Sequence, residues 1–207
     1  MNKLDAVEAR ILGSLIEKCF LTPEQYPLSF NALINACNQK TSREPVMELD
    51  TETVGRGLKG LQERGLAAQR FGSRVPKFAH HAEHLEIGDS TEVLAVLGVL
   101  LLRGAQTAAE LRVRTERMAH FTSNEQIEAV LQKLADHPQG PFVARLSRGR
   151  FQHLLCGDAP PPEPSYAPQA SPRTEPAGND RLDKLEERVA ALESLCRELQ
   201  ERTSRPA

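Results

Sequence analysis

Hydrophobic residues spaced three and four positions apart predict two successive sets of three helices in this chain. The predicted helices cover approximately residues 5–20, 29–38 and 51–64 in the first set, and 90–103, 107–115 and 123–134 in the second. Polar residues suited to N-caps lie at their starts: Asp5, Ser29, Asp50 or Thr51, Asp89 or Ser90, Thr107 and Ser123. Gln126 lies three residues after Ser123, where a capping box places Glu or Gln.

Each third helix is followed by two short strand-like segments that flank a basic, glycine-containing turn. The first pair lies within residues 66–78 and the second within residues 143–155. A helix followed by a two-stranded ribbon is typical of the end of a winged-helix domain. We therefore predict a mainly α fold with small β-wings, of the α+β class, in which residues 1–87 and 88–157 form two tandem winged-helix domains.

The two copies differ in one connection. The first copy holds eleven extra residues, which we infer by comparing the separations of Asp5 from Asp89 and of Val54 from Ile127. The extra residues fall mainly in the segment from Asn38 to Leu49, before the third helix. Because insertions in loops often carry function, this segment is the part of the first copy in which we most expect a functional role.

The composition changes after the second copy. Residues 158–179 are rich in Pro, Ala and Ser, which predicts a flexible linker. Residues 180–203 carry apolar positions at alternating spacings of three and four, which predicts a coiled-coil-like helix. About three heptads are marginal as an isolated helix, so we expect a homodimer or docking on another apolar surface, with a partly helical, frayed tail as the alternative.

Charge and cysteine usage narrow the class of protein. The formal net charge is −2 and no part of the chain is strongly basic, which counts against tight nonspecific binding to nucleic acid but leaves room for a local basic stripe. The four cysteines are scattered, which is typical of reduced cytosolic thiols. The longest apolar run, residues 93–102, is about half of the ~20 residues that span a bilayer. We expect a cytoplasmic protein with no membrane partner.

Basic residues on the first third helix and on both wings are candidates for contact with double-stranded DNA. A helix of this size can lie in the major groove while a wing reaches the backbone or minor groove. The candidates are Arg56, Lys59, Arg70, Arg74 and Lys77 in the first copy and Arg145, Arg148 and Arg150 in the second. The alternative is that these side chains are solvated surface, since arginine-rich turns also keep edge strands from aggregating.

The sequence offers no support for an enzyme or for a bound cofactor. It contains no glycine-rich phosphate loop, no Gly-x-Ser-x-Gly elbow and no His-Glu-x-x-His or zinc-ribbon spacing. His80, His81 and His84 follow the first wing, but adjacent residues of an extended segment point to opposite faces and no cysteine or paired carboxylate is nearby. We therefore expect no catalytic residues, no cofactor and no metal site.

Several stretches resemble the YceH family of uncharacterised bacterial proteins. The longest is LTPEQYPLSFNALINACNQKTSREPVM at residues 21–47, and further ones lie at residues 72–78, 102–112, 117–121 and 151–155. The resemblance implies two tandem winged-helix domains and carries no catalytic residues. It draws attention to residues 35–47, whose polar side chains are denser than a connector needs. As a partner or ligand segment we single out Asn35, Asn38, Gln39, Lys40, Arg43 and Glu44.

Two functions remain open from the sequence. The first is a regulator that binds DNA through the basic residues of the first copy. The second is a protein-docking module of a macromolecular complex with no direct contact to nucleic acid, since folds of this kind serve both purposes. The low net charge and the acidic third helix of the second copy favour docking.

Overall fold

The computed structural model describes residues 3–71, 74–87 and 90–157, all of which belong to one compact unit, Met1–Glu163. The predicted linker at residues 158–179 and the predicted heptad helix at residues 180–203, with the homodimer that it would support, lie outside the described residues. Within the described residues the fold has six α-helices and two small antiparallel sheets. The predicted α+β class is therefore confirmed.

The first set of elements begins with a helix whose N-terminus is closed by a reciprocal pair of hydrogen bonds between Asp5 and Glu8. Its elements are α1 (Ala6–Leu21), β1 (Leu28–Ser29), α2 (Phe30–Cys37), α3 (Thr51–Glu63), β2 (Ala67–Arg70), β3 (Lys77–His80) and the 3₁₀ helix η1 (Ala82–Leu85). The strand order is β1-β3-β2, with antiparallel pairs throughout. Gly65 follows α3 with a φ of 72°, a conformation that glycine adopts readily at the C-terminal end of a helix.

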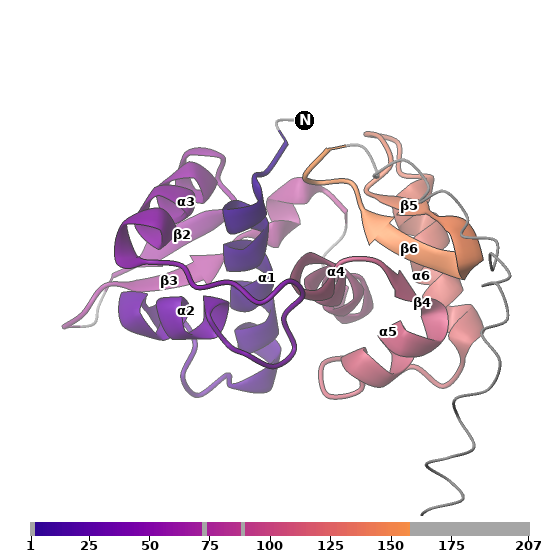
Figure 1. Cartoon of the computed structure of the whole chain (residues 1–207), viewed down its shortest axis with the longest axis horizontal. Coiled ribbons are helices and arrows are strands. Elements are labelled where there is room, and N and C mark those ends of the chain that lie inside the picture. The colour runs from indigo at the N-terminus through magenta and orange to yellow at the C-terminus, as the bar shows by residue number, and fades with distance from the viewer. Residues whose placement is uncertain (1–2, 72–73, 88–89, 158–207) are drawn as a thin grey trace, which may run out of the picture. The chain divides into compact units, whose positions relative to one another are not determined.

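The second set repeats the same order of α-helices and strands (Figure 1). Its elements are α4 (Thr91–Arg103), β4 (Gln106–Thr107), α5 (Ala108–Thr115), α6 (Asn124–Ala135), β5 (Val143–Arg145), the 3₁₀ turn η2 (Ser147–Gly149) and β6 (Arg150–His153). The strand order β4-β6-β5 matches that of the first sheet. We call β2 with β3 the first hairpin and β5 with β6 the second hairpin.

Two sequence predictions are wrong in detail. Each sheet has a third strand, β1 or β4, that the sequence pattern did not predict, because two residues are too few to show an alternation. The capping box at Ser123 does not form, because the Gln126 side chain accepts a hydrogen bond from the backbone N–H of Thr122 at 2.9 Å. The predicted N-caps Ser29, Asp50, Ser90 and Thr107 all accept the expected backbone hydrogen bond.

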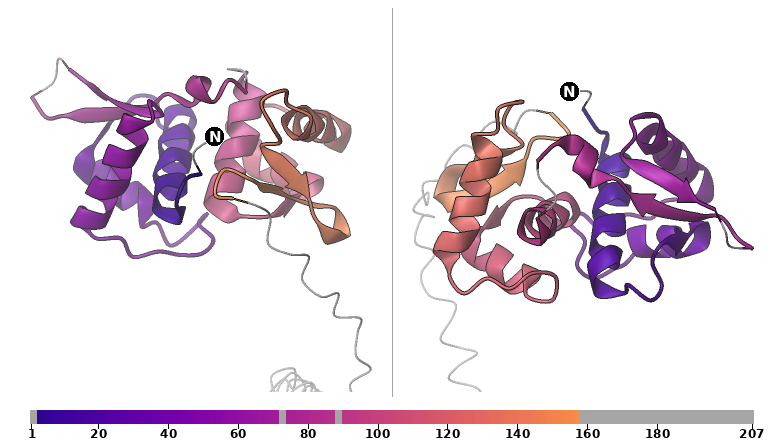
Figure 2. Two further views of the ribbon diagram at one scale, coloured as in Figure 1. Left: turned by 90° about the horizontal axis from the view of Figure 1, so that it is seen from above. Right: turned by 180° about the vertical axis from the view of Figure 1, so that it is seen from behind.

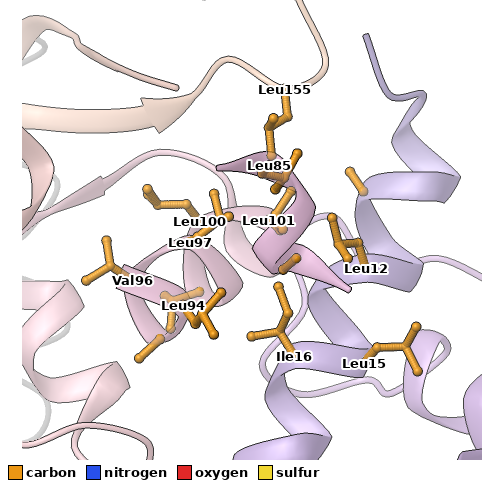
Figure 3. Close-up of a cluster of buried hydrophobic side chains, with 14 of the residues drawn as sticks. Leu12, Leu15, Ile16, Leu85, Leu94, Val96, Leu97, Leu100, Leu101 and Leu155 are labelled. Carbon is orange, nitrogen blue, oxygen red and sulfur yellow. The ribbon is translucent and has the colours of Figure 1, made fainter. Parts of the chain in front are cut away.

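One hydrophobic core runs through both sets of elements, and α1 and α4 pack side by side within it (Figure 3). Leu12 and Ile16 of α1 face Leu94 and Leu101 of α4, and all four are buried. Glycines allow the two helices to approach closely. A Cβ added at Gly13 would lie 2.9 Å from Leu101 Cβ, which is closer than side-chain carbons pack.

His153 of β6 makes the stability of the fold dependent on pH. Burial lowers the pKa of His153 to about 4, below the value of 6.5 expected in an unfolded chain. As far as His153 is concerned, the free energy of unfolding is highest above about pH 6.5 and falls as the pH drops towards 4, because the unfolded chain binds the proton more readily. We expect a loss of roughly 2–3 kcal/mol over this range. Chemical denaturation at several pH values measures the free energy of unfolding, which should depend less on pH in His153→Phe than in the wild type. An equal dependence in both proteins would show that His153 is not its cause.

Candidate nucleic-acid interface

The first hairpin carries a basic tip on an anchored base. At the base, the ring of Phe78 packs edge-on against Phe30 of α2 at 6.3 Å, and the backbone N–H of His80 donates to the Tyr26 hydroxyl at 2.7 Å. Figure 2 shows the hairpin projecting from the body of the first set of elements. These contacts anchor the base of the hairpin to α2 and to the loop before it.

The tip of the first hairpin concentrates positive charge. Arg70 and Arg74 are exposed, Lys77 is half-buried, and the chain has no acidic residue between Glu63 and Glu83. Arg70 and Lys77 are direct cross-strand partners in the antiparallel ladder. Because like charges directly opposite each other destabilise a sheet, an anion bound at this point would relieve a repulsion already present in the free protein.

Apolar side chains accompany these charges. The Phe71 side chain is 90% exposed and Val75 is 52% exposed, both next to the basic positions. An exposed aromatic ring beside arginines suits a surface that contacts stacked bases or sugars as well as phosphates. The first hairpin therefore combines positive charge with an exposed aromatic ring.

Helix α3 presents a face of balanced charge. Arg56 lies 3.3 Å from Glu52 and Lys59 lies 3.8 Å from Glu63, and all four side chains are exposed. On the buried side of α3, a Cβ added at Gly57 would lie 2.9 Å from Ile11 of α1. Gly57 thus serves close packing of α3 against α1. Since exposed ion pairs contribute at most about 1 kcal/mol, Arg56 and Lys59 can exchange their carboxylates for phosphates at low cost.

Two polar side chains of the predicted partner segment, 35–47, make structural contacts. Arg43 is 5% exposed and donates to both carboxylate oxygens of Glu17, at 3.1 and 2.7 Å, and to the Ala36 carbonyl. The Asn38 side chain exchanges two hydrogen bonds of 2.8 Å with the backbone of Leu49. Their polarity is thus used to hold loop 38–50 in place.

The other members of that segment remain on the surface. Lys40 and Glu44 are exposed. Asn35 and Gln39 line a shallow hollow of about 220 Å³ that also includes Lys18 and Gln25. The structure thus brings Asn35 and Gln39 together and places Arg43 in the interior.

Sequence reasoning missed the buried polar partners on α1. Arg10 is 1% exposed and donates to the carbonyls of Cys37 and Pro45, at 3.2 and 2.6 Å. Ser14 and Glu17 are also buried on this helix. The sequence does contain a signal for these residues. Positions 10, 14 and 17 are spaced four and three apart, so they form a polar row on a helix side that is otherwise apolar.

Two arginines of the second hairpin, Arg145 and Arg150, have local partners. The Arg145 guanidinium lies over the Phe151 ring, 5.7 Å from its centroid, and Arg150 donates to the Ala105 carbonyl at 3.1 and 2.6 Å. Arg148 occupies the turn with a φ of 56°. Helix α6 exposes Glu125 and Glu128. This half is therefore less suited to a polyanion than the first.

These elements define a small α+β protein with a basic, partly apolar hairpin tip as its candidate site. The chain belongs to the family described as "Protein of unknown function, DUF480", whose model matches residues 4–151. It is 43% identical to a UPF0502 protein of Vibrio campbellii, over 91% of this chain and 90% of that protein. It is also 43% identical to the UPF0502 protein YceH of Salmonella paratyphi B, over 97% and 94% of the two chains. The resemblance to the YceH family is confirmed.

A UPF0502 protein of Saccharophagus degradans is 41% identical, over 96% of this chain and 94% of that protein. The relatives thus match this chain along nearly all of its length. Among the described residues, no helix combines the length and the apolar character needed to cross a membrane.

Proposed function

We propose that this chain is a non-enzymatic, cytoplasmic regulator that binds double-stranded DNA through the first of two tandem winged-helix domains. The order of elements supports this proposal, because each half has three helices followed by an antiparallel hairpin that pairs with a short strand before the second helix. In this arrangement α3 is the candidate helix for the major groove and the first hairpin is the wing.

The observation that carries the proposal is the charge of the first hairpin. Arg70, Arg74 and Lys77 gather at one end with no carboxylate between them in the sequence, whereas the exposed face of α3 is balanced. The wing therefore contributes most of the attraction to phosphate, and Arg56 and Lys59 of α3 add to it once their carboxylate partners are exchanged. The near-zero charge of the whole protein then limits nonspecific affinity.

Replacing Arg70 and Arg74 with alanine is expected to weaken binding to a mixed-sequence duplex of about 30 base pairs by roughly tenfold or more at low salt. The plot of log affinity against log salt should lose about 0.9 in slope for each phosphate contact removed. Fluorescence anisotropy with labelled duplex, repeated from low to physiological salt, measures both quantities.

The matched control is Arg145→Ala with Arg148→Ala, which removes the same charge from the second hairpin. We expect this pair to retain most of the wild-type affinity and slope. Equal losses in both double variants would show that overall charge, rather than the first hairpin, governs binding. An absence of binding by the wild-type protein at low salt would exclude the proposed function.

A second candidate function is protein docking through the second half. The observation in its favour is a surface of mixed character: Val113 is 68% exposed and, with Arg112, Glu116, His120 and Phe121, lines a hollow of about 250 Å³. Glu125 and Glu128 on α6 add negative charge that repels phosphate. A stoichiometric partner that is retained after nuclease treatment and lost in Val113→Glu would favour docking over DNA binding.

A further inference from the structure

The histidines that follow the first hairpin are arranged differently from the sequence expectation. The backbone is extended only as far as His80, and residues 82–85 then form the 3₁₀ helix η1. Side chains three residues apart in a 3₁₀ helix lie above one another. The rings of His81 and His84 are accordingly stacked, with centroids 5.3 Å apart and planes at 14°.

Glu83 completes this group. One potential ligand atom from each of His81, Glu83 and His84 lies within 4.8 Å of the other two. The Nδ1 atom of His81 lies 2.5 Å from a carboxylate oxygen of Glu83. The extended backbone expected from the sequence would separate these side chains, whereas the turn of η1 brings two histidines and a carboxylate together.

The hydrogen bond of His84 prepares its ring to act as a ligand. Its Nδ1 lies 2.7 Å from the Gly65 carbonyl, and since a carbonyl can only accept, Nδ1 carries the proton. In the neutral ring Nε2 is then left with a free lone pair. Metal-binding histidines are commonly oriented in this way by a backbone carbonyl. Gly65 permits the approach, because a Cβ added there would lie 3.2 Å from His84 Nδ1.

We propose that His81, Glu83 and His84 form a binding site for a divalent transition metal, for which Zn²⁺ is the natural occupant. Two imidazoles and one carboxylate are a common zinc ligand set, with water completing the tetrahedron. Each histidine binds the ion through the ring nitrogen that carries no proton and keeps its one proton on the other nitrogen, so both act as neutral imidazoles. Binding also requires a shift of about an ångström or two among the three side chains, of which Glu83 and His84 are exposed and His81 is half-buried.

The site lies at the base of the first hairpin. The backbone N–H of His81 donates to the Leu66 carbonyl at 2.8 Å, so η1 is already tied to the turn between α3 and β2. A metal bound to η1 would reinforce this connection and hold the base of the hairpin more firmly. The role is structural, and it does not depend on whether the hairpin tip binds DNA.

Isothermal titration of the full-length, metal-free protein with Zn²⁺ at pH 7.5 should give one site per chain that depends on this group. His81→Gln combined with His84→Gln should weaken binding by at least about tenfold, and Glu83→Gln should weaken it less. His120→Gln is the matched control, because His120 is exposed and lies outside the group, and it should bind as the wild type does. Lowering the pH to 5.5 should weaken binding, because protons compete for both histidines.

Two further measurements distinguish this site from a cysteine site and from damage to the fold. Co²⁺ substitution should produce visible bands without the intense near-ultraviolet absorption of a cobalt–thiolate bond, which excludes a site made by cysteines. Thermal unfolding of the metal-free variants shows whether the substitutions damage the fold, while the Zn²⁺-dependent rise in Tm should occur only in the wild type and the control. Equal binding by the wild type and the double histidine variant, or no binding by either, would overturn the proposal.

Discussion

Arg43→Ala is expected to lower the free energy of unfolding by about 3–5 kcal/mol, because it leaves the Glu17 carboxylate buried without its main partner. The whole Arg43 residue is 5% exposed but its side chain is 0% exposed, and its Nη2 lies 2.7 Å from Glu17. It also donates two hydrogen bonds to the Ala36 carbonyl, which would lose both. Lys18 lies 3.4 Å from Glu17 and offsets part of the loss, so we expect a value near the lower end of this range. Urea denaturation provides the measurement.

Two companion variants test the cause of this loss. Glu17→Leu with Arg43→Met removes both charges and should be less destabilising than Arg43→Ala alone, since no isolated charge remains in the interior. Arg56→Ala breaks an exposed pair of the same type with Glu52, whose side chains are 71% and 80% exposed, and should cost less than about 1 kcal/mol. If Arg43→Ala costs no more than Arg56→Ala, the buried pair does not stabilise loop 38–50.

Gly13→Leu is expected to destabilise the protein by about 3 kcal/mol or more, because the contact between α1 and α4 has no room for a side chain. A Cβ at Gly13 would lie 2.9 Å from Leu101 Cβ and 3.0 Å from Leu102 Cγ, before the rest of leucine is added. Gly98 on α4 faces Ile16 with a similar lack of space, at 3.0 Å. Overpacking of this kind forces shifts in both helices. Thermal and chemical unfolding should both report the loss.

Gly55→Ala is the matched control for a helical glycine. A Cβ at Gly55 would lie 3.7 Å from Phe30 Cζ, an ordinary contact distance. Since alanine is favoured over glycine in a helix, this variant should raise stability by up to about 1 kcal/mol. If Gly13→Leu lowers the free energy of unfolding and Gly55→Ala raises it, the packing around each glycine decides the effect of the substitution. A neutral Gly13→Leu would mean that α1 and α4 can separate without cost.

The helices could be predicted because their causes are local. Ser29 accepts from the Ala32 N–H at 3.3 Å and Asp50 accepts from the Thr53 N–H at 2.7 Å, and each partner is only three residues away. The strands β1 and β4 could not be predicted, because two residues become a strand only when β3 or β6 lies beside them. A helix cap depends on residues that are close in the sequence, whereas strand pairing depends on residues that are far apart in the sequence.

The candidate site was predictable only in part for the same reason. The sequence identifies the basic residues of the first hairpin, but it does not reveal that Arg70 and Lys77 are direct cross-strand partners. It draws attention to Arg43 as a polar residue, but its partner Glu17 lies 26 residues earlier in the chain. It contains His81 and His84, but the stacking of their rings depends on a 3₁₀ helix that no periodic pattern in the sequence predicts.

The sequence alone determined the repeated order of helices and hairpins, the helix ends and the location of positive charge, because these follow from hydrophobic spacing, capping and composition along a continuous stretch. Only the tertiary structure decided which polar side chains are interior and which are available to a partner. Arg43 and Arg74 are the same residue type, and the sequence does not show which of them is buried. In the structure Arg43 is buried against Glu17, whereas Arg74 is exposed near the tip of the first hairpin. Burial depends on the packing of distant segments, and a buried charge must be paired within the protein, whereas an exposed charge is free to face solvent.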